Sequence, residues 1–243
     1  MHPILFKLGP FTVYSYGFMI ALAFLAGIAL ASYLAKRDGI DPDKIFDLAV
    51  WVLVSSIIGA RVFYVLEFIG DFAKDPLSAL YLWQGGMVFF GGVAFAIIAV
   101  AIWSRVNKIN VLKLLDAIAP ATALGYAIGR IGCFLRGCCY GTETSLPWGV
   151  QFPDACGVRH PTQIYSSLSG LLMMALLLLV LSKRKFDGQV FSAGLMLYSV
   201  YRFLIEFIRT NPKYLFSLSE GQWGSVLIFI CGAGLYYYFR KQS

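Results

Sequence analysis

Long apolar stretches alternate with short polar segments along this chain. The apolar stretches cover about residues 14–35, 45–69, 85–103, 112–130, 162–181, 189–208 and 223–239. A helix needs about 20 mostly apolar residues to cross a bilayer, and these stretches come close to that length. The pattern therefore predicts an all-α integral membrane bundle of about seven transmembrane helices, with residues 1–243 forming a single membrane domain.

The composition also indicates a membrane protein. Hydrophobic residues make up 59% of the chain and charged residues 14%, against about 45–50% and about 25% in an average soluble domain. This excludes an ordinary soluble enzyme, a disordered chain and a small disulfide-stapled secreted domain. The first ten residues carry no basic cluster and no cleavage site follows the first apolar stretch, so we expect that stretch to be retained.

Basic side chains lie at the ends of the apolar stretches, which argues against nucleic acid as a partner despite the net charge of +7. Eleven of the 20 fall on one side of the predicted bundle, and the positive-inside rule makes that side cytoplasmic: Lys36, Arg37, Lys44, Arg105, Lys108, Lys113, Lys183, Arg184, Lys185, Arg240 and Lys241. The other side holds Lys7, Lys74, Arg130, Arg136, Arg159, Arg209 and Lys213. We therefore expect the N-terminus outside, the C-terminus in the cytoplasm and the long loop 131–161 on the outer face.

Several charged residues fall inside or at the end of predicted spans, where an ionisable group usually faces a cavity or a partner. They are Arg61, Arg130, Arg202, Glu206 and Arg209. Steps of four, four and three residues place Tyr198, Arg202, Glu206 and Arg209 on one helix face.

Two interpretations of these charges remain open. Glu206 and one arginine can form a structural ion pair within the bundle. Alternatively, four arginines exceed the two nearby glutamates, Glu67 and Glu206, and the excess forms a cationic cavity. The planar fork of arginine suits a phosphate, and in a membrane the simplest anionic ligand is a phospholipid headgroup.

Six segments spread over nearly the whole chain carry a family resemblance. They are YGFMIALAFLAG (16–27), GARVFYVL (59–66), DPLSALYLWQGGMVFFGG (75–92), GRIGCFLRG (129–137), RHPTQIY (159–165) and YRFLIEFIR (201–209). In order and spacing they resemble the prolipoprotein diacylglyceryl transferase family.

The resemblance implies a membrane transferase that moves the diacylglyceryl group of phosphatidylglycerol to the thiol of a lipobox cysteine in an exported prolipoprotein. A thioether forms and glycerol phosphate leaves. The expected partners are the phospholipid, the prolipoprotein signal peptide and the membrane, and the expected location is the bacterial cytoplasmic (inner) membrane. No cofactor and no metal belong to this expectation.

The resemblance also suggests site residues. Tyr16, Arg130 and Arg202 match essential positions, and Arg61, Glu206, Arg209, His160 and Gln163 match other motif positions. Arg130 is the first candidate for phosphate contact and Arg202 the second, while the Tyr16 hydroxyl would orient a phosphate oxygen. The expected headgroup site comprises Arg130, Arg61, Arg202, Glu206, Arg209 and Gln163.

Four positions depart from the family pattern. Phe90 stands where the family has His, Cys133 replaces an Asn, and Cys138 and Ser166 each replace a Glu. If the reaction needs an imidazole base, His160 is the available candidate.

Four cysteines gather in or beside the outer loop, and three interpretations of them are open. Cys156 could form a disulfide with Cys138 or Cys139, whereas these two neighbours should not pair with each other. The four cysteines could bind a metal, although they form no pair of C-x-x-C motifs and His160 is the only histidine near them. Cys138 could be a catalytic nucleophile, because Arg136 lies two residues away and would stabilise its thiolate.

The leading hypothesis is diacylglyceryl transfer from phosphatidylglycerol to prolipoproteins. One alternative is a paralogue that uses a phospholipid donor with a different acceptor through cysteine chemistry. A second alternative, from another class, is a non-catalytic lipid-binding or redox membrane protein. A thiol or imidazole beside the arginine cavity would favour catalysis, since reacting groups are held close to contact.

Overall fold

The computed structural model describes residues 1–9, 11–72, 75–212, 214 and 217–242, so the basic residues Lys74 and Lys213 lie outside the described part. The chain forms two compact units, one of residues 1–34 with 115–243 and the other of residues 35–114. We describe each unit by itself.

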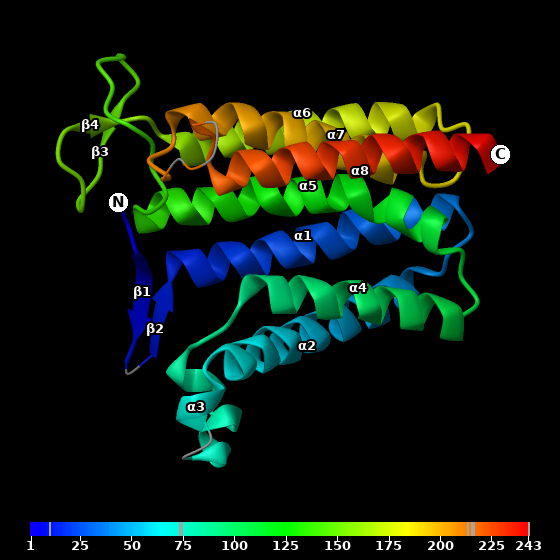
Figure 1. Ribbon diagram of the computed structural model, residues 1–243, viewed down its shortest axis with the longest axis horizontal. Coiled ribbons are helices and arrows are strands. Elements are labelled where there is room, and N and C mark those ends of the chain that lie inside the picture. Colours follow the sequence, from blue (N-terminus) through cyan, green and yellow to red (C-terminus); the bar gives the residue numbers. More distant parts are fainter. Residues whose placement is uncertain (10, 73–74, 213, 215–216, 243) are drawn as a thin grey trace. The chain divides into compact units, whose positions relative to one another are not determined.

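The first unit is a bundle of long helices (Figure 1). Its elements are the antiparallel hairpin of β1 (Ile4–Leu8) and β2 (Phe11–Tyr14), α1 (Ser15–Arg37), α5 (Val111–Arg136), the antiparallel pair β3 (Val150–Gln151) and β4 (Val158–Arg159), α6 (Thr162–Ser182), α7 (Gln189–Ile205), the short 3₁₀ turn η3 (Glu206–Ile208) and α8 (Glu220–Gln242). The last residues of α1 and the first of α5 belong to the other unit.

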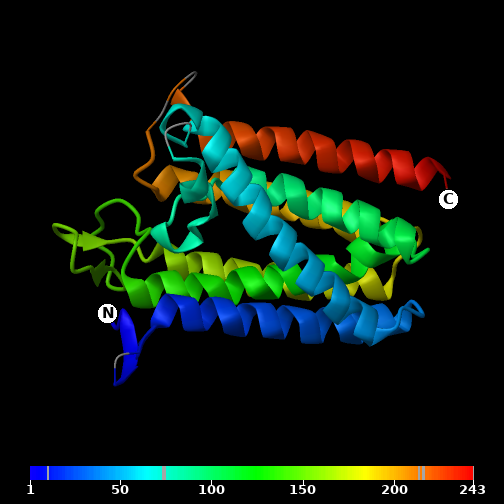
Figure 2. The same ribbon diagram turned by 90° about the horizontal axis from the view of Figure 1, so that it is seen from below.

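Small residues let the helices of this unit approach one another. Helices α1 and α5 run side by side (Figures 1 and 2), and a Cβ added at Gly132 would lie 2.9 Å from the Met19 Cβ. At Gly170 in α6 an added Cβ would lie 2.9 Å from the Ala127 Cβ of α5. Close packing of this kind drives helix association in a membrane, where the hydrophobic effect does not act between helices.

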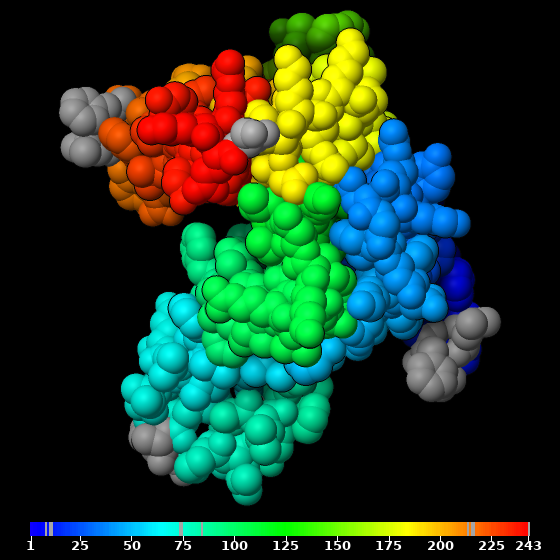
Figure 3. All heavy atoms as spheres, turned by 90° about the vertical axis from the view of Figure 1, so that its right-hand side faces the viewer, coloured from blue at the N-terminus to red at the C-terminus, as the bar shows by residue number. Residues whose placement is uncertain are grey.

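One end of the first unit carries the turn between α6 and α7. The carboxylate of Asp116, which is fully buried, accepts hydrogen bonds from the backbone N–H groups of Gly188 (2.8 Å) and Phe191 (2.9 Å) at the start of α7. It thereby satisfies donors that a helix start leaves unpaired. The turn (yellow) and the end of α8 (red) lie together in Figure 3. The ring centroids of Phe186 in the turn and Tyr236 in α8 are 5.1 Å apart.

The opposite end carries the loop of residues 137–161. Backbone hydrogen bonds tie this loop to the end of α7 and the start of α6: the Thr142 N–H donates to the Ile208 carbonyl (2.9 Å), and the His160 N–H donates to the Thr142 carbonyl (3.0 Å). Gly141 and Arg209 form an isolated antiparallel bridge. The loop is therefore fixed beside Arg209.

The second unit pairs α2 (Pro42–Glu67) with α4 (Phe89–Val106), and the segment between them contains α3 (Ile69–Phe72) and the 3₁₀ helices η1 (Pro76–Leu80) and η2 (Leu82–Gln84). The side chain of Asp41 accepts from the Asp43 N–H and caps the start of α2. Across the helix pair, the Trp103 indole donates to the Asp47 carboxylate at 2.6 Å.

Within the described residues, six helices are long and apolar enough to cross a membrane: Ser15–Arg37, Pro42–Glu67, Phe89–Val106, Val111–Arg136, Thr162–Ser182 and Gln189–Ile208. The predicted all-α membrane fold is thus confirmed. Helix α8 forms over the seventh predicted stretch but lies outside this set of six. Its glycines and its three consecutive tyrosines, Tyr236 to Tyr238, make it less apolar than the others.

Candidate active site

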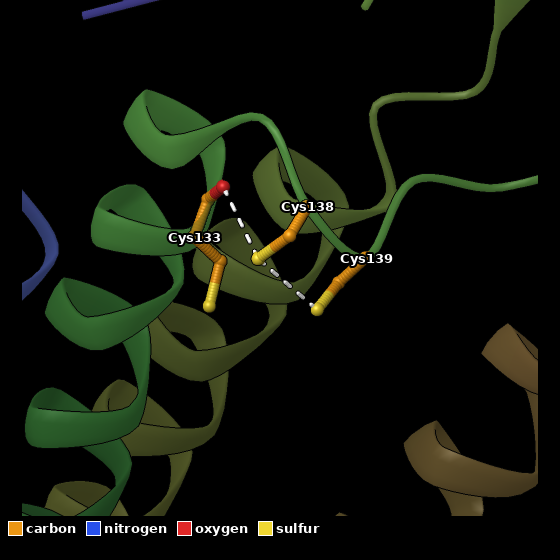
Figure 4. Close-up of side chains that lie close together, drawn as sticks. All are labelled: Cys133, Cys138 and Cys139. Carbon is orange, nitrogen blue, oxygen red and sulfur yellow. Dashed lines mark hydrogen bonds between the residues drawn. The ribbon is translucent and has the colours of Figure 1, made fainter. Parts of the chain in front are cut away.

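Three cysteines meet where α5 passes into the loop of residues 137–161. Cys133 lies in the last turn of α5, and Cys138 and Cys139 follow the helix directly. Their three Sγ atoms lie within 4.8 Å of one another, and the Sγ atoms of Cys138 and Cys139 are 3.4 Å apart. In Figure 4 the three side chains converge on one small region. We call Cys133, Cys138 and Cys139 the thiol cluster.

The fourth cysteine of the region, Cys156, does not join this cluster. All five cysteines of the chain are among the described residues, and all are free thiols. The suggested pairing of Cys156 with Cys138 or Cys139 is therefore wrong for this structure. The sequence favoured Cys156 because loop cysteines on an outer face often pair, but Cys133 is held one turn back on the same helix end and takes the place beside them.

Buried side chains at the start of α6 hold the backbone of the thiol cluster. The Thr162 hydroxyl donates to the Cys139 carbonyl (2.7 Å), and the Gln163 Nε2 donates to the Cys138 carbonyl (2.6 Å). Both side chains are almost fully buried. Cys139 itself has φ +68°, a left-handed conformation that costs energy for a non-glycine residue and persists only where the surroundings enforce it.

The two loop thiols differ in their electrostatics. A hydrogen bond with the Cys133 thiol lowers the pKa of Cys139 to about 5, and Arg209 and Arg130 act in the same direction. Burial instead raises the pKa of Cys138, with only partial compensation from Arg136. The sequence suggested Cys138 as the stabilised thiolate; the structure corrects this to Cys139, because the neighbouring thiol and two arginines face Cys139.

Arg130 lies on α5 one turn before Cys133 and has an aromatic environment. Its guanidinium lies 4.8 Å from the ring centroid of Tyr126, and that ring meets Tyr198 and Tyr201 of α7 edge-on, at 6.0 and 6.2 Å. In the part of the chain that the structure describes, Arg130 has neither a carboxylate partner nor a hydrogen-bond acceptor. Its N–H donors are therefore available to a ligand.

Glu206 is the carboxylate partner of the arginines that the sequence places with it on one helix face, Arg202 and Arg209. This carboxylate is buried and accepts from the Arg202 guanidinium, from Asn211 and from the Ser219 hydroxyl. Arg209 Nε lies 3.8 Å from the same carboxylate and, among described residues, has no hydrogen-bond partner. The structural ion pair considered from the sequence thus describes Arg202, whereas Arg209 is only partly neutralised.

Tyr16 lies on the first turn of α1, beside the thiol cluster. The Arg136 guanidinium is 5.8 Å from its ring centroid, and Tyr16 interacts electrostatically with all three thiols of the cluster. Close approach of α1 to α5 at Gly132 brings this tyrosine there. Its side chain is partly exposed.

His160 has local partners. Its Nδ1 lies 3.3 Å from the Tyr165 hydroxyl, which also accepts from the Trp148 indole at 2.8 Å. Its backbone carbonyl accepts from Gly141 N–H at 2.9 Å. These contacts fit a residue that fixes the outer loop.

Comparison with known proteins assigns the chain to a family. The sequence model of the family described as prolipoprotein diacylglyceryl transferase matches residues 3–238. The chain belongs to this family. Relatives named phosphatidylglycerol–prolipoprotein diacylglyceryl transferase include proteins of Clostridium tetani (37% identical, all of both chains covered), Finegoldia magna (36%, all of this chain and 97% of the relative) and Trichormus variabilis (34%, 99% and 91%). The family resemblance seen in the motifs is confirmed, and the chain is an enzyme of the diacylglyceryl transferase family.

Arg61, another motif residue of the diacylglyceryl transferase family, belongs to the second unit and has a different environment. It is 6% exposed, and all five of its N–H donors are used by backbone carbonyls. Nε donates to Ala79 (2.8 Å), and the two terminal nitrogens donate to the carbonyls of Ser78, Tyr81, Gly85 and Gly86 at 2.6–3.4 Å. This arrangement argues against Arg61 as a headgroup ligand and makes it the organiser of the segment between α2 and α4.

Two other departures from the diacylglyceryl transferase pattern now have a structural setting. Phe90 lies in the first turn of α4 and is 76% exposed. Ser166 is buried, donates to the Thr162 carbonyl (2.6 Å) and accepts from the Tyr201 hydroxyl (2.5 Å). Neither position carries a group that can act as a base near neutral pH.

Sequence reasoning missed three contributors to this site. Cys139 was named only as a possible disulfide partner, Tyr126 was not connected with Arg130, and Asn211 was not assigned to Glu206. The closeness of Cys139 to the other two cysteines was detectable, because three cysteines within seven residues at a helix end can reach one point, but its electrostatic environment was not. The other two contacts depend on tertiary packing and carry no signal in the sequence.

Proposed function

We propose that this chain transfers the diacylglyceryl group of phosphatidylglycerol to the lipobox cysteine thiol of exported prolipoproteins, at the outer face of the bacterial cytoplasmic membrane. The observation that carries the proposal is Arg130, a guanidinium without a carboxylate partner among the described residues. A second, only partly neutralised cation, Arg209, interacts electrostatically with the same thiol as Arg130, that of Cys139. The names of the relatives supply the substrate pair.

In this proposal Arg130 and Arg209 hold the phosphodiester of the lipid. Arginine binds a phosphate through two parallel N–H donors, which fixes both position and orientation. Arg202 adds positive potential while remaining paired with Glu206, and the Tyr16 hydroxyl contacts a phosphate oxygen. Gln163 acts through the backbone of Cys138, as a positioning residue of the site.

An apolar groove offers room for part of an acyl chain. It has a volume of about 290 Å³ and lies between α7 and α8, lined by Ser199, Val200, Phe203, Leu204, Ser225, Val226, Phe229 and Ile230. Phe203 directly follows Arg202 along α7, so the groove begins beside the charged stripe. A lipid with its headgroup at the arginines would place an acyl chain along this face.

The chemical step follows from the reaction. The thiol loses its proton, its sulfur attacks the glyceryl carbon bound to the phosphate oxygen, the C–O bond breaks, and glycerol phosphate leaves with the electron pair. The leaving phosphate gains negative charge, and preorganised arginine donors stabilise that charge where it develops. The outer loop, and with it the N-terminus, would face outward and the C-terminus the cytoplasm.

Complementation tests the proposal. The chain is expressed in a bacterium depleted of its own diacylglyceryl transferase, and a reporter lipoprotein is analysed by mass spectrometry. We expect a thioether-linked diacylglyceryl group on the lipobox cysteine, and no such group with Arg130→Ala. A membrane-inserted protein that gives no lipidation would contradict the proposal.

The thiol cluster favours one alternative, a paralogue that passes the lipid group to another acceptor. It lies beside Arg130 and Arg209, and it occupies positions where the family carries Asn and Glu. In the same assay this alternative predicts consumption of phosphatidylglycerol that depends on Arg130 but leaves the reporter unmodified. The proximity of thiols to the arginines argues against a merely lipid-binding protein.

A further inference from the structure

The thiol cluster has the donor set and spacing of a metal site. A zinc ion with Zn–S bonds of about 2.3 Å holds its sulfur ligands about 3.8 Å apart. The three Sγ atoms lie within 4.8 Å of one another, and those of Cys138 and Cys139 are 3.4 Å apart. Shifts of less than about 1 Å would therefore bring all three sulfurs onto one ion.

The chemistry of the donors narrows the choice of metal. Three thiolates are soft ligands that select zinc or copper(I) over magnesium or calcium. Among the described residues no fourth His, Cys, Asp or Glu joins the cluster. Three protein ligands and one open position are the arrangement of catalytic zinc sites, and zinc does not change its oxidation state.

The protein holds the three cysteines in place before any ion binds. The end of α5 is closed by hydrogen bonds from the Gly137 and Cys138 N–H groups to the Cys133 carbonyl (3.0 and 3.2 Å). Thr162 and Gln163 hold the carbonyls of Cys139 and Cys138. Cys139 has a left-handed backbone conformation with φ +68°, and in Figure 4 its side chain lies close to those of the other two cysteines.

The surrounding charge suits a metal–thiolate centre. Three thiolates and one Zn²⁺ carry a net charge of −1. Arg130 and Arg209 interact electrostatically with Cys139, and Arg136 does so with Cys138. These cations would compensate the remaining charge without competing for the ion.

We infer that Cys133, Cys138 and Cys139 bind one zinc ion, and that its open fourth position takes the thiol of the acceptor cysteine. The second half of this inference rests on the proposed function. The exposed Cys139 places that position on the accessible side of the cluster, next to the arginines proposed to hold the lipid phosphate.

Zinc coordination would activate the acceptor thiol at this site. Phe90 and Ser166 carry no base, and His160 is bound to Tyr165. A thiol that coordinates zinc gives up its proton to water and remains nucleophilic as the thiolate. Its sulfur then forms the C–S bond as the C–O bond breaks and glycerol phosphate leaves, after which the thioether dissociates from the ion.

Metal analysis of the purified full chain tests the site independently of activity. We expect about one zinc per chain in the natural protein and in Cys231→Ser, a matched control on α8, and at least tenfold less in Cys139→Ser or Cys133→Ser. Cobalt(II) bound by the natural protein should give thiolate-to-metal charge-transfer absorption bands, and these bands should be absent from Cys139→Ser. The absorption reports the ligands of the metal directly, so it can also be measured when a variant is purified in low yield.

Three results would overturn the metal site. They are equal zinc in Cys139→Ser and the natural protein, copper in place of zinc, or a disulfide within the cluster in the protein as isolated. Alkylation followed by mass spectrometry detects the disulfide, and bound zinc should protect the three cluster cysteines while Cys156 and Cys231 react.

The lipidation assay distinguishes the zinc site itself from the role of zinc in activating the acceptor thiol. Removal of zinc by a chelator should reduce thioether formation at least 100-fold, and added zinc should restore it. Unchanged lipidation by zinc-free protein would overturn the activation role and leave the proposed function standing. Bound zinc without any lipidation, even at full occupancy, would overturn the proposed function and the activation role while the metal site stands.

Discussion

Two arginines in predicted membrane spans, one in each unit, differ in how far their N–H donors are used by the protein. Arg61 is buried in the second unit and donates five hydrogen bonds to backbone carbonyls. Arg130 in the first unit has the face of Tyr126 and, within the described chain, no acceptor. From the sequence both looked alike, since each is an arginine within an apolar stretch and each matches a family motif.

The difference teaches that a charge within a span marks function only when its donors are free. The backbone carbonyls around Arg61 offset the free-energy cost of removing its guanidinium from water, and they accept hydrogen bonds from all of its N–H donors. Arg130 has no hydrogen-bond acceptor among the described residues, so its N–H donors remain available to a ligand. We expect substitutions to separate these roles, one by loss of stability and the other by loss of activity.

Arg130→Gln should give the largest effect. Lipidation of the reporter should fall by about 100- to 1000-fold, the usual loss when a donor to a developing negative charge is removed. Because the side chain makes no hydrogen bond or ion pair with the described residues, the unfolding midpoint in detergent should change little. Arg130→Lys keeps the charge without the planar fork and should be intermediate; full activity in Arg130→Gln would contradict the headgroup role.

Arg61→Gln should act on stability. The change leaves several buried carbonyls without a donor, and we expect a loss of about 3 kcal/mol or more in the free energy of unfolding. Denaturation of the purified protein in mixed micelles measures it. Lipidation per folded molecule should stay within about threefold; a loss as large as that of Arg130→Gln in a stably folded protein would return Arg61 to the active site.

Glu206→Gln should reduce stability, but by less than Arg61→Gln. It removes the carboxylate that pairs with Arg202 and approaches Arg209, while an amide can still accept from Ser219. We expect a loss of about 2 kcal/mol in stability, the range for hydrogen bonds to a buried charged group. Glu67→Gln is the matched control, because Glu67 is exposed, and it should be neutral.

His160→Gln should give the smallest effect, a change in lipidation rate of less than about threefold. The Gln amide can still reach the Tyr165 hydroxyl, and the backbone contacts of residue 160 with the loop do not depend on the side chain. A general base would instead contribute about 100- to 10,000-fold. A loss of that size, with an unchanged unfolding midpoint, would make His160 the base and remove the need for zinc.

The helices and the charged stripe of α7 could be predicted because they depend on local spacing. Apolar length gave the spans, and helical periodicity placed Arg202 beside Glu206. The stripe changes at Glu206, where the helix tightens into the η3 turn and Arg209 takes an extended backbone conformation. This turn delivers Arg209 to the loop, and no pattern in the sequence marks it.

The roles of Arg61 and Cys139 could not be predicted in the same way. The acceptors of Arg61 are main-chain atoms of Ser78 to Gly86, and main-chain atoms leave no trace in side-chain composition. The position of Cys139 depends on the left-handed turn after α5 and on Thr162, which lies 23 residues further along the chain. Both features arise from contacts between distant segments.

The bridge between Gly141 and Arg209 has a consequence for how this enzyme can vary. Gly141, Thr142, His160 and Ile208 hold the base of the loop of residues 137–161 through main-chain atoms, so exposed side chains between residues 143 and 158 are not needed to hold that base, whereas Phe152 is fully buried. Such a loop can change its sequence, and with it the surface offered to an incoming polypeptide, while the reaction centre stays still. Acceptor preference and chemistry can therefore be inherited, or engineered, separately.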